Sequence, residues 1–325
     1  MVIGLRVLAS LCLLIGFGIC SSHAQERYPN RTVQIIVPSS PGGVTDVIAR
    51  MVGQAMSKAW GTPIIVVNRP GADEVVGLNS VAKSKNDGYT LLVSNDAAFT
   101  AGPHLHSQHL FDTLKDFTPI LFLGQITPVL CVPASLPVHS VSEFIAYAKA
   151  HAGNMNYASF GVGTYAHLSM EELNKRTGTN ILHVPYKGST PATVALLRGE
   201  VSAMIVNINV IAQHVRAGSV RIIAAAGPSR STFLPDLPTI AESGVPGFAT
   251  GAWWGLFGPA DMPPAVIDKI RRDVAAYLQT SEAVKFFEQN TIEPVQKTPE
   301  QFSNLIRGDF EHWGALIKAV GVNHD

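Results

Sequence analysis

The stretch Val33-Gln34-Ile35-Ile36-Val37-Pro38-Ser39-Ser40-Pro41-Gly42-Gly43-Val44-Thr45-Asp46 predicts a strand, a sharp glycine loop and the start of a helix. Residues 33–37 are nearly all β-branched and apolar, which is typical of a strand buried on both faces. Pro38 and Pro41 cannot extend a hydrogen-bonded ladder, so the strand ends there. From residue 47 onward, apolar residues recur at the spacing of one helix face, at Ile48, Met51, Val52, Ala55, Met56 and Ala59.

The two glycines of this loop permit unusual backbone angles and leave no side chain over the backbone. A helix that begins at such a loop has unpartnered N–H groups and a partial positive charge, which together favour an anion. No lysine is present, so this is not a phosphate-binding Walker loop. The hydroxyls of Ser39, Ser40 and Thr45 suit a weakly charged anion such as a carboxylate. The alternative is an ordinary tight turn in which Thr45 or Asp46 caps the helix.

Residues 1–24 have the form of a signal peptide. A single basic residue precedes an apolar run that ends at Cys20, and Ser22-His23-Ala24 has the small-x-small pattern of a cleavage site. The apolar run is too short to span a membrane comfortably. A lipoprotein is less favoured, because Ile19 stands where a small residue is expected before Cys20. We therefore expect export to the periplasm with cleavage after Ala24.

The composition limits the partners of the chain. With 24 basic and 24 acidic residues the chain is close to neutral, which argues against nucleic acid or an anionic membrane surface as a partner. Cys131 is the one cysteine beyond the signal peptide, so no internal disulfide is expected. It lies in an apolar run, which predicts a buried, inert thiol. The length is ample for two α/β domains.

The rest of the chain alternates β-rich runs with helical patterns, which indicates parallel sheets. Strands are expected at residues 63–67, 89–93, 121–132 with a break at Pro128, 156–158, 181–184, 201–206 and 220–226. Helices are expected at residues 77–83, 141–150, from within 159–167 to about 176, 208–217, from 263, and from 298 to about 320. Ser140 with Glu143, and Thr298 with Gln301, have the spacing of capping boxes.

A second glycine loop follows the strand at residues 156–158. Ser159-Phe160-Gly161-Val162-Gly163-Thr164-Tyr165-Ala166-His167 again combines a strand end, spaced glycines and a helix start. His167 could contact a ligand or cap this helix. Further on, Ser189 or Thr190 is expected to cap a helix that has Pro191 in its first turn.

Metal binding and catalysis find little support in the sequence. His104-x-His106-x-x-His109 resembles a metal cluster, but no carboxylate or cysteine stands at a spacing that completes a site. The chain contains neither a Gly-x-Ser-x-Gly nucleophile elbow nor a His-Glu-x-x-His motif. We expect no metal, no cofactor and no enzyme activity.

Several longer motifs are similar to those of a known family. They are Val37-Pro38 with Pro41-Gly42-Gly43-x-x-Asp46, Asn68-Arg69-Pro70-Gly71-Ala72, Asp87-Gly88-Tyr89-Thr90-Leu91-Leu92, Gly161-x-Gly163-Thr164-x-x-His167-Leu168, His183-Val184-Pro185-Tyr186-Lys187-Gly188, Pro235-Asp236-Leu237-Pro238-Thr239-Ile240-Ala241-Glu242-Ser243-Gly244 and Trp254-Gly255-Leu256-Phe257. With these motifs the chain resembles the periplasmic solute-binding proteins of tripartite tricarboxylate transporters, the Bug family. The resemblance covers essentially all of the chain beyond the signal peptide.

The resemblance implies an α/β fold of the periplasmic-binding-protein type (type II), with a ligand cleft between two lobes. Residues 25–125 and 227–325 are expected to form lobe 1 and residues 126–226 lobe 2, with crossings at Val129–Val132 and Val220–Ala226. The ligand-binding residues carried over from the family are Ser39, Ser40, Gly42, Gly43, Thr45, Asp46, Ser94, Asn95, Ser159, Gly163, Thr164, His167 and Asn207.

The implied function is capture of a small organic acid and its delivery to a membrane transporter of the tripartite tricarboxylate type, by a protein expected to be monomeric. A solute sensor that acts on a membrane receptor, or a secreted enzyme on the same scaffold, are the alternatives. The chain departs from the family pattern at Ser39 and Ser40 and at Asp73-Glu74. Val206 stands where a carboxylate often occurs in the family, which disfavours a ligand with an ammonium group.

Overall fold

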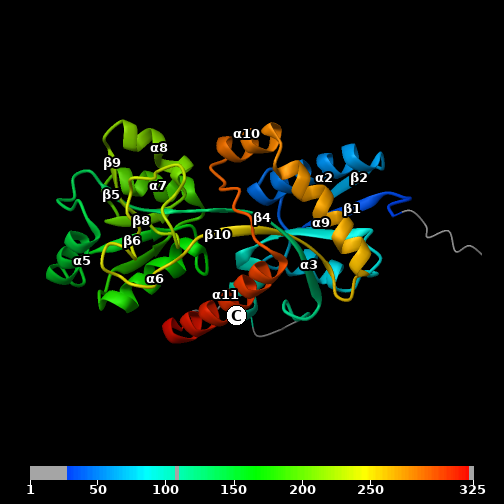
Figure 1. The fold of residues 1–325 in the computed structure, drawn as a ribbon. Helices are drawn as coiled ribbons and strands as arrows, with labels where there is room; N and C mark the ends of the chain where they lie inside the picture. Colours follow the sequence, from blue (N-terminus) through cyan, green and yellow to red (C-terminus); the bar gives the residue numbers. More distant parts are fainter. Residues whose placement is uncertain (1–27, 107–109, 322–325) are drawn as a thin grey trace, which may run out of the picture.

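The computed structural model describes residues 28–106 and 110–321, which form two lobes side by side (Figure 1). Each lobe is built around one five-stranded sheet covered by helices. The predicted signal peptide lies outside the described residues. Within the described ranges, no helix is both long enough and apolar enough to cross a membrane.

The sheet of the first lobe has the strand order β2-β1-β3-β10-β4. Its strands are β1 (Val33–Val37), β2 (Ile64–Asn68), β3 (Thr90–Asn95), β4 (Phe117–Ile126) and β10 (Ala252–Pro259). Strand β1 is parallel to β2 and β3, whereas β10 runs antiparallel to β3 and β4. The sheet therefore combines strands from the beginning of the chain with one strand from its last third.

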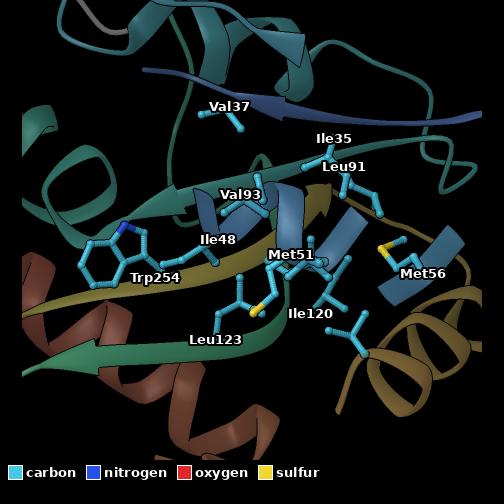
Figure 2. Packing of buried hydrophobic residues seen from close by; sticks show 14 of the residues in the cluster. Ile35, Val37, Ile48, Met51, Met56, Leu91, Val93, Ile120, Leu123 and Trp254 are labelled. Atoms are coloured by element: carbon cyan, nitrogen blue, oxygen red, sulfur yellow. The ribbon is translucent and has the colours of Figure 1, made fainter. Parts of the chain in front are cut away.

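The helices of this lobe cover both faces of the sheet. They are α2 (Val44–Trp60), α3 (Val75–Ala82), the short π-helix η1 (Ala97–Ala101), α4 (Gly102–Leu105), α9 (Pro264–Leu278), α10 (Ser281–Gln289) and α11 (Pro299–Val320). The predicted apolar face of α2 is buried: Ile48 and Met51 pack with Ile35 and Val37 of the sheet and with Trp254 of β10, as Figure 2 shows. This packing fixes where the first glycine loop enters α2.

The sheet of the second lobe has the order β7-β6-β8-β5-β9. Its elements are β5 (Val129–Pro133), α5 (Val141–Ala150), β6 (Asn156–Ser159), α6 (Tyr165–Thr177), β7 (Leu182–Pro185), α7 (Ser189–Leu197), β8 (Ala203–Val206), α8 (Ile208–Arg216) and β9 (Val220–Ala225). Cys131 is fully buried and its thiol donates to the Met204 carbonyl at 3.3 Å, as expected of an inert thiol.

The expectation of parallel sheets is wrong for one strand in each lobe. Strand β10 is antiparallel to both neighbours in the first sheet, and β5 is antiparallel to β8 and β9 in the second. Both strands enter their sheet from the other lobe. Their direction is therefore set by the path of the chain between lobes, which local residue patterns do not encode.

The two crossings also lie elsewhere than expected. Residues 129–132 and 220–226 pair with one another inside the second sheet and do not connect the lobes. The chain passes between the sheets at Thr127–Pro128, between β4 and β5, and it returns near Gly251, just before β10. The two connections are so close that a Cβ on Gly251 would approach the Ile126 carbonyl to 2.9 Å.

The segment between β9 and β10 belongs with the second lobe, although residues from 227 on were predicted in lobe 1. Ile240, Val245 and Phe248 of this segment are buried in the core cluster that also contains Phe144 and Tyr157. An isolated bridge between Ala225 and Thr239 continues the sheet. The segment has no long strand or helix of its own, so its attachment depends on these apolar side chains.

Candidate functional site

A cavity of about 410 Å³ lies between the two lobes. The first lobe contributes Val44, Thr45, Asn95, Asp96, Ala97, Ile126, Ala252, Trp254 and Asn290, and the second lobe contributes Phe160, Thr164, Tyr165, Ser189, Asn207, Asn209 and Val210. Other hollows, such as those around Phe111 and around Leu234, are each lined by a single lobe. The volume is in the range of pockets that bind small molecules.

Four helices begin at this cavity. Helix α2 begins at Val44, α6 follows its N-cap Thr164, α7 begins at Ser189, and α8 follows its N-cap Asn207. Each N-terminus has N–H groups without partners in its own helix and carries partial positive charge. No lysine or arginine of the described residues lines the cavity. The site therefore favours an anion through fixed dipoles and neutral donors.

Asp46 holds the first glycine loop in shape and does not line the cavity. Its carboxylate accepts the Gly42 N–H at 3.0 Å, the Arg50 guanidinium at 2.9 and 3.0 Å, and the Asn68 amide at 3.0 Å. Burial alone would raise the pKa of Asp46, but the hydrogen bonds from Arg50, Gly42 and Asn68 together lower it. The Gly42 N–H donates to Asp46 in this structure, and the predicted role of Gly42 as a ligand donor stays a prediction.

Neither Thr45 nor Asp46 is the N-cap of α2, although both were considered for this role. The N-cap residue is Gly43, and no side chain caps the helix. Thr45 lies in the first turn, where its Oγ1 accepts the indole N–H of Trp254 at 3.0 Å. The Thr45 hydroxyl thereby keeps its own hydrogen for another acceptor. Thr45 lines the cavity as predicted, whereas Gly43 does not.

The serines of this loop are not part of the cavity wall. The Ser39 carbonyl accepts the Asn68 amide at 3.0 Å, and Ser40 is exposed. Neither serine is part of the cavity lining. Their role toward a ligand stays a prediction.

The end of β3 brings Asn95 to the cavity but not Ser94. The Asn95 amide nitrogen donates to the Glu74 carboxylate at 3.2 and 3.3 Å, and its Oδ1 accepts the Ala98 N–H at 3.1 Å. Burial raises the pKa of Glu74, although this hydrogen bond opposes the shift. Ser94 is fully buried in the sheet. Glu74 thus orients Asn95 from outside the lining.

The second glycine loop reaches the cavity through Phe160, Thr164 and Tyr165. Thr164 lines the cavity, whereas Ser159, Gly163 and His167 are not part of its lining. Ser159 Oγ is 2.6 Å from His183 Nε2, and His167 Nδ1 accepts the Gly163 N–H at 3.1 Å. The two imidazole rings are stacked with centroids 4.0 Å apart. His167 therefore fixes the loop that precedes α6.

Asn207 lines the cavity and connects the lobes. Its Oδ1 accepts the Thr291 hydroxyl at 3.1 Å, and its backbone N–H donates to the Tyr165 hydroxyl at 3.2 Å. Thr291 follows α10 of the first lobe. Of the predicted residues, the structure thus brings Thr45, Asn95, Thr164 and Asn207 together in one cavity wall.

Several lining residues were missed from the sequence. Asp96 and Tyr165 directly follow predicted residues, so extending each loop by one position would have included them. Asn290 and Trp254 come from distant parts of the chain, and no local pattern relates them to the glycine loops. Ser189 was predicted as a helix cap, but the N-cap of α7 is Gly188 and Ser189 is the first helical residue.

The two described histidines of the His104-x-His106-x-x-His109 motif lie next to groups that do not form a metal site. His104 Nε2 lies 2.9 Å from the Phe310 carbonyl, and His106 Nε2 lies 3.4 Å from Asp73. His109 lies outside the described residues. Among the residues that are described, no three His, Cys, Asp or Glu side chains gather into a group able to hold a metal ion.

Comparison with known proteins identifies what the chain is similar to. The model of the tripartite tricarboxylate transporter family receptor, TctC, matches residues 48–322. The protein BugT of Bordetella pertussis is 36% identical over 319 residues, which are 98% of each chain.

Two solved structures of Rhodopseudomonas palustris proteins have the same fold. One was solved with adipate; it is 31% identical, has a TM-score of 0.74, and the match covers 90% of this chain and 98% of that one. The other, MatC with bound malate, is 31% identical, has a TM-score of 0.71, and the match covers 89% of this chain and all of that one. The predicted two-lobed periplasmic-binding-protein fold is confirmed.

Proposed function

Because the chain belongs to the tripartite tricarboxylate transporter family of receptors, we propose that it captures a small organic acid between its lobes in the periplasm. It then delivers that acid, chemically unchanged, to a membrane transporter of the tripartite tricarboxylate type. The observation that carries the proposal is the cavity between the lobes, at which the N-termini of α2, α6, α7 and α8 meet and which no lysine or arginine of the described ranges lines.

The lining suits a short carboxylic acid. The N–H groups at the start of α2 and the Thr45 hydroxyl provide donors for a carboxylate, and closure of the lobes strengthens these contacts by excluding water. Ile126, Phe160 and Trp254 provide apolar surface for a carbon chain. The relatives solved with adipate and with malate support this class of ligand.

The arrangement does not support a secreted hydrolase. Ser159 and His183 form a hydrogen-bonded pair of the kind that activates a serine, with 2.6 Å between Oγ and Nε2. However, Ser159 is fully buried, and its hydroxyl donates its single proton to the Gly161 carbonyl at 3.1 Å, so it does not donate to His183. A substrate in the cavity would not reach this hydroxyl, so we interpret the pair as a support for the glycine loop.

A thermal-shift panel of dicarboxylates, hydroxy acids, aromatic acids and amino acids tests the binding function. An acid present at about a hundred times its dissociation constant should stabilise the protein by roughly 2.7 kcal/mol. Ala97→Trp should abolish this shift, because Ala97 is exposed at the cavity wall and an indole there would occupy the ligand volume.

Val194→Trp is the matched control, since Val194 is 39% exposed and lies outside the lining. It should keep the shift. If Ala97→Trp bound the acid as tightly as wild type, the cavity would not be the binding site. For delivery, cells without this protein should lose uptake of the acid identified in the panel, and unimpaired uptake would favour a sensor instead.

A further inference from the structure

Asp96 is the one carboxyl group among the described residues that line the cavity. It follows Asn95 at the end of β3 and precedes η1, and only 6% of its surface is exposed. Its Oδ1 accepts the backbone N–H of Trp253 at 3.4 Å. An acidic side chain in a wall otherwise suited to anions requires a chemical explanation.

None of the described titratable groups around Asp96 is a positively charged partner for its carboxyl group. Asp309 of α11 acts on Asp96 through its negative charge, and it accepts the Trp253 indole N–H at 2.8 Å. The Tyr165 hydroxyl approaches from α6 of the other lobe. His104 of α4 is directed to the Phe310 carbonyl. None of the described lysines or arginines forms an ion pair with Asp96.

These surroundings favour the neutral acid. Burial, with a further contribution from the negative charge of Asp309, raises the pKa of Asp96 to about 8, although backbone N–H groups oppose the shift. An anionic ligand in the cavity would add negative charge and stabilise the neutral form further. A neutral carboxyl group is a hydrogen-bond donor, whereas an ionised one only accepts.

We propose that Asp96 donates its proton in a hydrogen bond to an oxygen atom of the bound acid, and that this contact selects oxygen-bearing di- and hydroxy acids over their amino counterparts. The inference rests on the proposed function, because it concerns a ligand of the same cavity. Asp96 adds a donor from the first lobe where Tyr165 and Asn207 line the opposite wall. An ammonium group would instead require an ionised Asp96 beside Asp309, in a cavity whose helix N-termini repel cations.

Malate and aspartate are the matched probes, since they differ only by a hydroxyl and an ammonium group. Calorimetry should show that wild type binds malate more tightly than aspartate. Malate affinity should be constant between about pH 6 and pH 7 and fall about tenfold between about pH 7 and pH 9, as Asp96 loses its proton. Malate is fully ionised in this range, so the change in malate affinity is caused by a titrating group of the protein and not by malate itself.

Two variants test whether Asp96 donates a hydrogen bond to the ligand or only supports the structure of the cavity. In Asp96→Asn the decrease of malate affinity with pH should disappear, because the amide donates at every pH. Asp96→Leu should bind malate at least about tenfold more weakly than Asp96→Asn at about pH 7. Circular dichroism confirms that both variants are folded.

The outcomes distinguish this inference from the proposed function. The inference is overturned if wild type prefers aspartate, or if malate affinity is independent of pH and equal in Asp96→Asn and Asp96→Leu. If malate fails to bind, adipate is used as the probe with the same variants. Failure of every acid to bind wild type would overturn the proposed function itself.

Discussion

Thr45 and Asp46 are neighbours in the first turn of α2, yet their side chains serve different purposes. Asp46 is turned into the loop, where Gly42, Arg50 and Asn68 donate to it. Thr45 faces the cavity and accepts the indole N–H of Trp254. Asp46 therefore stabilises the loop, whereas the Thr45 side chain contributes to the cavity wall.

Thr45→Val should destabilise the protein by about 1–3 kcal/mol, because the buried indole N–H of Trp254 would lose its acceptor. Thr45→Ser keeps the hydroxyl and should lose less than about 1 kcal/mol. Urea unfolding measures both values. Equal stability of wild type and Thr45→Val would show that the hydrogen bond to Trp254 contributes nothing.

Asp96 should make the protein less stable as the pH rises. The pKa of Asp96 is about 8 in the folded protein against an ordinary value of 3.8, so the folded state holds this proton where the unfolded state releases it. Its contribution to stability is therefore complete at low pH and is lost progressively between these two values. Asp96→Asn should raise the melting temperature by at least about 2 °C at about pH 8 and not at about pH 4. A shift of the same size at both pH values would contradict a raised pKa.

Single residues of the site could be predicted where the chain places them at the end of a strand, as for Asn95, or at a helix start. Thr45, Thr164 and Asn207 all stand at such positions, and all three line the cavity. Gly42 and His167 looked equally suitable, but hydrogen bonds within their own loops occupy them. Such pairings depend on the exact loop conformation, which residue types do not specify.

At the scale of elements, periodicity and capping predicted most helices and strands. Both predicted capping spacings start a helix: Thr298 forms the complete box with Gln301, and Ser140 accepts the Glu143 N–H while the Glu143 side chain reaches the His139 N–H. The predicted direction of β5 and β10 and the predicted cap of α7 were wrong. Both depend on the path of the chain outside the element.

The capping box of α11 provides a prediction at this scale. Thr298→Ala should cost about 1 kcal/mol, because the Gln301 N–H loses the Thr298 hydroxyl at the exposed start of a long helix. Thr298→Ser should be close to wild type. Chemical denaturation monitored by circular dichroism measures the difference, and an unchanged midpoint for the alanine variant would contradict the predicted role of the cap.

At the scale of the whole molecule, a buried carboxylate secures the crossing between lobes. Glu293 is 2% exposed and accepts the Thr127 hydroxyl at 3.0 Å, the Ser231 hydroxyl at 2.7 Å and the Thr232 N–H at 3.3 Å. These donors come from the first crossing and from the segment that packs on the second lobe. The sequence did not indicate this centre, because its members are far apart in the chain.

Glu293→Ala should destabilise the protein by about 2–4 kcal/mol, since several buried donors lose a charged acceptor together. Glu288→Ala, at an exposed position of α10, should change stability by less than about 0.5 kcal/mol. Urea unfolding of the two variants tests this difference. Similar midpoints for both would show that Glu293 does not support the crossing.

The most direct measurement is a crystal structure of the protein with the tightest-binding acid of the thermal-shift panel. The predicted result is one molecule of acid in the cavity between the lobes, with a carboxylate against the start of α2 and the Thr45 hydroxyl. Occupied density only in a hollow lined by a single lobe, with the cavity between the lobes empty, would contradict the proposed site.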